Sequence, residues 1–149
     1  MRAVIQRVIE ASVTVEDQII SEIKQGFLVL LGVSEDDTEE DMKWIAKKIS
    51  GMRIFSDSEG KLNLNLEQVD GEILLVSQFT LYADTKRGNR PGFSKAAGFA
   101  LGNQLYEATA LELRNYGLTV KTGEYGADMQ VSLINDGPVT IILDSSEKS

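Results

Sequence analysis

The chain has 149 residues, 42% of them hydrophobic, which fits one compact domain over 1–149 that buries a core of its own. It contains neither cysteine nor histidine, and this excludes disulfides, a Ser-His-Asp triad, a Cys-His pair and the usual zinc sites within the chain. The formal net charge of −8 argues against the binding of long duplex nucleic acid through a broad basic face, so any contact with nucleic acid should be local.

The first part of the chain is predicted to form β-strands. β-branched and apolar residues dominate three runs, at 2–8, 11–23 and 26–33, and the middle run is broken at Asp17-Gln18 as a hairpin turn would break it.

The segment 35–51 predicts a helix. Acidic residues crowd its start, Asp37 or Thr38 is suited to cap it, and Gly51 marks its end. Apolar side chains recur on one helical face, at Met42, Ile45, Ala46 and Ile49.

Two extended regions follow. Residues 52–66 predict a strand, a glycine-containing turn and another short extended piece. The run 71–84 is the longest β-type run, although Ser77, Gln78 and Thr80 interrupt it with polar side chains. These side chains either alternate across a strand with period two, or they face a cleft that satisfies them.

A second helix is predicted to end at Gly117, with Ser94 as its N-cap. Its apolar residues at helical spacing are Ala97, Leu101, Leu105, Ala108 and Leu111.

The closing strands are predicted at 118–123, 128–135 and 138–143, and 144–149 has the composition of a flexible tail. Between the last two strands stands Asn135-Asp136-Gly137-Pro138. This tetrapeptide reads either as a turn or as backbone displayed in a site.

Taken together, these elements predict a mixed α/β fold with a largely antiparallel, barrel-like sheet and two packing helices. No run approaches the roughly 20 apolar residues that span a bilayer, and the start lacks the features of a signal peptide. We therefore expect a soluble, cytoplasmic protein that does not associate with membranes.

Two short segments together carry a resemblance to a known family. SQFTLYAD at 77–84 and NDGPVT at 135–140 resemble the paired signature of D-aminoacyl-tRNA deacylases, also called D-tyrosyl-tRNA deacylases. MRAVIQRV, GFLVLLGV, KRGNRPGF and GADMQVSLINDGPVT are similar to that family at compatible spacings, so the resemblance extends through Leu143. Gly92 stands where that family usually has serine and Tyr125 where it usually has phenylalanine, which affects fine substrate contacts more than activity.

The resemblance implies a homodimeric hydrolase without cofactor or metal. Such an enzyme cleaves the ester between a D-amino acid, or glycine, and the terminal ribose of tRNA, and rejects L-aminoacyl substrates. It also implies that the Gly137-Pro138 bond is cis, and that this dipeptide enters the partner subunit's pocket containing Ser77, Gln78, Phe79 and Thr80, where it acts as a chiral gate.

The residues of the first signature suggest how the ester is cleaved. Main-chain N–H groups around Phe79 and Thr80 are suited to an oxyanion hole, and Ser77 and Gln78 to positioning of the substrate. Thr80 invites assignment as a nucleophile, yet the chain has no histidine to activate it. We therefore expect water to be the nucleophile, with help from the ribose 2′-OH.

The segment 85–95 is suited to the RNA. Lys86, Arg87, Arg90 and Lys95 form a local basic patch that either contacts tRNA phosphates or is a solvated loop. Terminal adenosine could contact Tyr125 or Met129, although such residues more often serve packing.

Two further interpretations stay open. The chain could be a non-catalytic module that binds the tRNA acceptor end, or a metal-assisted hydrolase that uses its acidic clusters.

Overall fold

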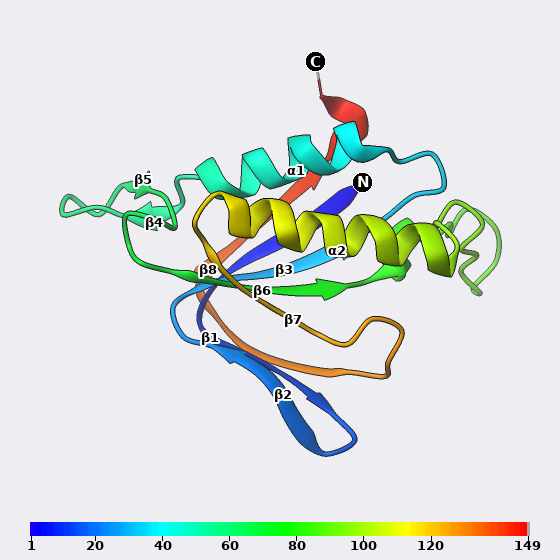
Figure 1. Ribbon diagram of the computed structural model, residues 1–149, viewed down its shortest axis with the longest axis horizontal. Coiled ribbons are helices and arrows are strands. Elements are labelled where there is room, and N and C mark those ends of the chain that lie inside the picture. The colour runs from blue at the N-terminus through cyan, green and yellow to red at the C-terminus, as the bar shows by residue number, and fades with distance from the viewer. Residues whose placement is uncertain (149) are drawn as a thin grey trace.

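The computed structural model describes residues 1–148, and it shows two helices packed against one face of a strongly curved sheet (Figure 1). The main sheet has the order β2-β1-β3-β6-β7, with β8 paired to β1. Its strands are β1 (Arg2–Val15), β2 (Gln18–Ile23), β3 (Gly26–Gly32), β6 (Glu72–Ser77), β7 (Thr119–Thr122) and β8 (Gln130–Asp144).

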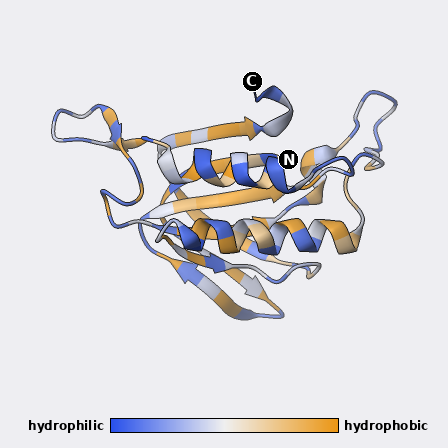
Figure 2. Ribbon diagram, turned by 45° about the horizontal axis from the view of Figure 1, so that its top comes forward, coloured by the Kyte–Doolittle hydropathy of each residue, from blue (hydrophilic) through white to orange (hydrophobic). Residues whose placement is uncertain are grey.

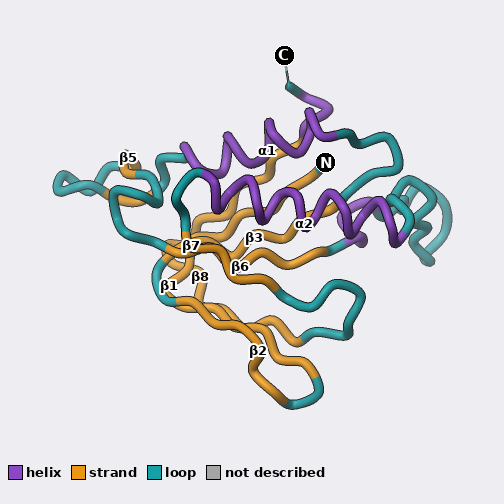
Figure 3. Tube along the Cα trace, in the orientation of Figure 1, coloured by secondary structure: helices purple, strands orange, loops and turns teal. Residues whose placement is uncertain are grey.

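The sheet is nearly closed into a barrel, as Figure 3 shows. β1 pairs with β3 through its first half, with β2 through its second half, and with β8 along almost its whole length. At the seam between β2 and β7, Lys121 Nζ donates a hydrogen bond to the carbonyl of Glu22 at 2.8 Å. The predicted mixed α/β, barrel-like fold with two helices is confirmed.

Within the main sheet, two of the five strand pairings are parallel. β3 pairs with β6, and β6 with β7, in parallel. Each of these pairs is joined through a connection that contains a helix, and a helix crossover returns the chain to the same edge of the sheet. The carboxyl ends of β3, β6 and β7 therefore lie at one edge.

The helix α1 (Glu39–Gly51) begins and buries its side chains as predicted. Thr38 is the N-cap, and its backbone N–H donates to Asp41 Oδ2 at 2.9 Å. All four residues of the predicted apolar face are buried, and hydrophilic and hydrophobic residues alternate along both helices (Figure 2).

The helix α2 (Phe99–Asn115) starts later than predicted, with Gly98 rather than Ser94 as its N-cap. Residues 95–97 instead pair with residues 33–35, directly after β3. The N–H of Ala97 donates to the carbonyl of Val33 at 2.9 Å. Leu111 is 59% exposed, so the predicted apolar face is also rotated. The buried face comprises Gly102, Leu105, Tyr106, Thr109, Ala110 and Leu113. The helix ends at Asn115, two residues before the predicted end at Gly117, which has φ +89°.

β3 and β6 are buried on both faces, which explains their unbroken apolar runs. Phe27, Val29 and Leu31 pack into the core between sheet and helices. Leu28, with Leu74 of β6, packs into a second core inside the barrel.

The remaining extended segments form small features of the surface. β4 (Phe55–Ser56) and β5 (Leu62–Leu64) make the predicted short hairpin. The two predicted strands before residue 16 are one continuous β1, and the hairpin turn uses Glu16-Asp17, both with positive φ, one residue earlier than predicted. Among the described helices, none is long and apolar enough to cross a membrane.

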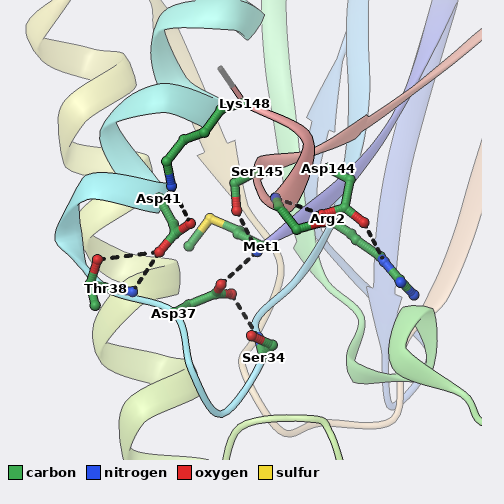
Figure 4. A network of polar contacts seen from close by, with 10 residues as sticks. Met1, Arg2, Ser34, Asp37, Thr38, Asp41, Asp144, Ser145 and Lys148 are labelled. Carbon is green, nitrogen blue, oxygen red and sulfur yellow. Dashed lines mark hydrogen bonds and ion pairs between the residues drawn. The ribbon is translucent and has the colours of Figure 1, made fainter.

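The two ends of the chain meet beside α1 (Figure 4). The Met1 ammonium group is buried, 2.6 Å from Asp37 Oδ1 and 2.7 Å from Ser145 Oγ. Lys148 Nζ lies 2.8 Å from Asp41 Oδ1. Where a flexible tail was predicted over 144–149, the structure instead has η2 (Ser145–Glu147), which packs on α1, and Ser149 lies outside the described residues.

Candidate active site

The first signature segment does not continue the strand. β6 ends at Ser77, and Phe79–Tyr82 form a one-turn 3-10 helix, η1. Of the two alternatives for this segment, the alternation of a strand with period two is therefore wrong. The N–H of Gln78 donates to the carbonyl of Leu31 at 2.8 Å, the last ladder bond before the turn. Beyond it, neither β3 nor β7 offers further strand.

A glycine makes room for this turn on the end of β3. A Cβ atom added at Gly32 would lie 3.0 Å from Leu81 Cβ and 3.1 Å from the Gln78 carbonyl oxygen. Any larger residue at Gly32 would therefore push η1 away from the sheet.

Two main-chain donors are left at the start of η1. The first N–H groups of a helix have no partner within it, and those of Phe79 and Thr80 have no acceptor among residues 1–148. The Phe79 side chain is 58% exposed, and Gln78 Nε2 donates to Thr80 Oγ1 at 3.1 Å. Two neighbouring N–H groups without an internal acceptor, on exposed residues, are suited to stabilise a developing oxyanion.

Two cavities adjoin this turn, and both are lined by Ser77, Gln78, Phe79 and Gly126. The larger, about 500 Å³, is also lined by Thr80 and Met129. The smaller, about 320 Å³, is also lined by Tyr125. The structure thus brings four predicted catalytic residues together with both residues predicted to contact adenosine, but it separates Tyr125 and Met129 into neighbouring cavities.

The wall of the smaller cavity contains residues that the sequence did not reveal. Phe99 meets Tyr125 edge-to-face, with ring centroids 4.9 Å apart, and its carbonyl accepts a hydrogen bond from the Tyr125 hydroxyl at 3.2 Å. A Cβ atom at Gly102 would clash with that hydroxyl oxygen. Burial raises the pKa of Tyr125, so it meets a ligand as a neutral phenol. The signal that the sequence offered was the aromatic Phe99 three residues before Gly102.

The predicted basic patch lies on the exposed loop between η1 and α2. Lys86, Arg87, Arg90 and Lys95 are all exposed, and none of them forms an ion pair with another described residue. The loop is closed at its base by Asp84, whose backbone pairs with that of Gly92. The four cations are thus free to contact an anionic ligand.

The second signature segment is neither a turn between two strands nor regular strand. β8 runs through it, but Asn135 and Thr140 pair with β1 residues only two positions apart, so the residues between them bulge from the ladder. Asn135 Oδ1 accepts from the N–H of Val139 at 3.1 Å, which closes the bulge. The Gly137-Pro138 bond is cis, as predicted, and both residues are exposed.

Arg7 holds this bulge from the β1 side. The Arg7 side chain is almost completely buried; its Nε donates to the Asp136 carbonyl at 3.0 Å and Nη1 to the Ile54 carbonyl at 2.8 Å. Gly137 has φ +131°, and a Cβ atom there would lie 2.8 Å from Val139 Cγ2. Only glycine fits without displacement.

The two signature segments do not share a cavity within one chain. Neither Gly137 nor Pro138 lines the two cavities at Ser77–Phe79. The possible metal site of the acidic clusters is a separate question. No group of three or more acidic residues with metal-binding geometry occurs in residues 1–148.

Comparison with known proteins gives matches over nearly the whole chain. The family model described as D-Tyr-tRNA(Tyr) deacylase matches residues 4–144. The D-aminoacyl-tRNA deacylase of Thermotoga petrophila is 56% identical over 147 residues, 99% of each chain. That of Lacticaseibacillus casei is 56% identical over 148 residues, 99% of this chain and 100% of the relative.

Solved structures agree with the fold. The c-Myc DNA unwinding element binding protein superposes with a TM-score of 0.90 at 42% identity, covering 97% of this chain and 98% of that one. A probable eukaryotic D-amino acid tRNA deacylase superposes with a TM-score of 0.84 over 95% of this chain and 97% of its own, at 16% identity, a likeness of fold alone.

Proposed function

The chain belongs to the D-Tyr-tRNA(Tyr) deacylase family, and from this premise we propose that it hydrolyses the ester of D-aminoacyl-tRNA to release free tRNA and the D-amino acid. The full-length match to D-aminoacyl-tRNA deacylases at 50 to 56% identity carries the proposal. Glycyl-tRNA is a second substrate. The protein acts in the cytoplasm, where aminoacyl-tRNA is used.

Main-chain groups and water carry the chemistry. Water attacks the ester carbonyl carbon, assisted by the ribose 2′-OH, and the N–H groups of Phe79 and Thr80 stabilise the oxyanion. The bond from that carbon to the ribose 3′-oxygen then breaks, and the 3′-oxygen takes a proton. Ser77 and Gln78 position the ester. This assignment is supported by the two unpaired N–H groups beside the cavities.

The tRNA end approaches across the adjoining surface. Lys86, Arg87 and Arg90 contact its phosphates, which is supported by their exposure and their lack of ion-pair partners among the described residues. The terminal adenosine contacts Tyr125 or Met129, on either side of Gly126.

Gly137-Pro138 of one subunit serves the active site of its partner in a two-fold dimer. The dipeptide crowds the direction in which an L side chain would point, whereas a D side chain points to solvent and glycine has none. The exposure of both residues supports this role, as does their absence from the cavities of their own chain. On the same strand, Ile134 and Ile142 are 48% and 71% exposed, an apolar surface suited to a subunit contact.

A deacylation assay with D-Tyr-tRNA, L-Tyr-tRNA and Gly-tRNA tests the proposal. We expect turnover of the first and third substrates and none of the second. Binding of all three without turnover would instead identify a non-catalytic module for the tRNA acceptor end, and loss of turnover in chelator would indicate a metal-assisted hydrolase.

A further inference from the structure

Arg2, at the start of β1, contacts the turn that carries the proposed oxyanion hole. Its Nη1 donates to the carbonyl of Leu81 at 2.9 Å, and its guanidinium carbon lies 4.5 Å from the centroid of the Tyr82 ring. On its other side, Nε donates to Asp144 Oδ2 at 2.9 Å, as Figure 4 shows. One side chain thus joins η1 to the end of β8.

η1 needs such a contact because it is too short to hold itself. Its start is fixed by the bond from Gln78 to the carbonyl of Leu31 at the end of β3. At its other end, the last carbonyls of a helix have no partner within it, and an arginine there both satisfies a carbonyl and complements the helix dipole. Beyond Ala83 the chain enters the exposed loop 84–92, whose base is closed by the backbone pairing of Asp84 with Gly92.

We propose that Arg2 is a positioning residue for catalysis: it fixes the C-terminal end of η1 so that the N–H groups of Phe79 and Thr80 keep their direction toward the reacting carbonyl. This inference rests on the proposed deacylase function. Arg2 lines neither cavity at the active site, so it acts through Leu81 and Tyr82. A displacement of about 1 Å in a catalytic group lowers the rate on the order of 100-fold.

Asp144 provides a matched control. Asp144→Asn removes the charge that faces Arg2 but leaves Arg2 free to bond the Leu81 carbonyl. In the unmodified protein, the N–H of Ser146 donates to Asp144 Oδ1 at 2.9 Å. The amide oxygen of asparagine can accept the same hydrogen bond. A loss caused only by breaking the ion pair would therefore appear in both variants.

The experiment compares Arg2→Met and Asp144→Asn with the unmodified protein on D-Tyr-tRNA. Methionine keeps an apolar stem over Tyr82 but has no donor. We expect kcat of Arg2→Met to fall about 10- to 100-fold with KM within about threefold, and Asp144→Asn to stay within about threefold of the unmodified kcat. Hydrogen exchange should accelerate in Arg2→Met at the amides of Leu81 and Ala83, which donate to the carbonyls of Gln78 and Thr80, with α1 unchanged.

Unmodified kcat in folded Arg2→Met would overturn the inference, as would an equal fall in Asp144→Asn. If Arg2→Met fails to fold, Arg2→Gln, whose amide stops short of the Leu81 carbonyl, is judged by the same criteria. If the unmodified protein turns over none of the tRNA substrates, the proposed function fails instead. The exchange at the amides of Leu81 and Ala83 then still decides whether Arg2 holds η1.

Discussion

Mixed dimers test whether each active site takes its two signature segments from different subunits. One lesion is Gly137→Ala, which must displace the dipeptide, because a Cβ atom at Gly137 would lie 2.8 Å from Val139 Cγ2 and 3.1 Å from Arg7 Nη2. The other is Phe79→Pro, which deletes one proposed oxyanion donor. Phe79 is the first residue of η1, a position that accepts proline, and Gln78 before it is already extended, at φ −147° and ψ 90°.

The size of the expected rescue follows from symmetry. Loss of one oxyanion donor lowers kcat about 100- to 1000-fold, so Phe79→Pro alone is nearly inactive. The rescue also requires that Gly137→Ala, whose dipeptide is displaced, is inactive alone, which is measured first. When the two are unfolded and refolded together in equal amounts, about half of the dimers are mixed. In every mixed dimer, one site carries both lesions and the other carries neither. About one quarter of the unmodified activity should therefore return.

The assay is D-Tyr-tRNA hydrolysis after co-refolding, with different tags on the two variants so that mixed dimers can be counted. The unmodified protein refolded in parallel sets the reference, and variants mixed without unfolding give the background. Phe79→Ala is the matched control for the lost ring, because it keeps the N–H, and we expect it to retain far more activity than Phe79→Pro. If mixed dimers are present and activity stays at the background, one chain supplies both segments and the cross-subunit gate is refuted.

Three further changes probe the nucleophile, the RNA surface and the helix cap. Thr80→Ala should retain hydrolysis within about tenfold of the unmodified rate, since main-chain donors and water act; complete loss, with an aminoacyl adduct on Thr80 of the unmodified protein, would make Thr80 the nucleophile. Arg87→Ala with Arg90→Ala should raise KM and flatten its dependence on salt, without a change in melting temperature; an altered kcat at unchanged KM would contradict phosphate contact. Although burial opposes it, hydrogen bonds from Lys148 and Thr38 hold the pKa of Asp41 well below its ordinary value of 3.8. Because the folded-state pKa is the lower one, this stabilisation is present above about pH 4 and lost below it. Asp41→Asn should therefore lower the free energy of unfolding by about 1 kcal/mol at pH 7, with the difference shrinking as pH falls below about 4; a difference that grew toward acid would refute this assignment.

The local sequence determined those helices and strands whose pattern of apolar residues follows directly from burial. The apolar face of α1 was predictable because its four residues recur at helical spacing beside a capping sequence. β3 and β6 were predictable because burial on both faces requires a continuous apolar run. The paired signatures also identified the family.

Only the tertiary structure decided how the two signature segments are shaped. Thr80, Leu81 and Tyr82 suit a strand, yet β6 stops at Ser77 because its neighbours end there and Gly32 leaves space for a turn. Asn135 to Pro138 suit a turn, yet β8 continues, because β1 pairs on both sides of the bulge and buried Arg7 binds its backbone. In both places, residues distant in sequence decide whether the backbone finds hydrogen-bond partners: they are missing beyond Ser77 and present around the bulge of β8. Local propensity contains no information about such distant partners.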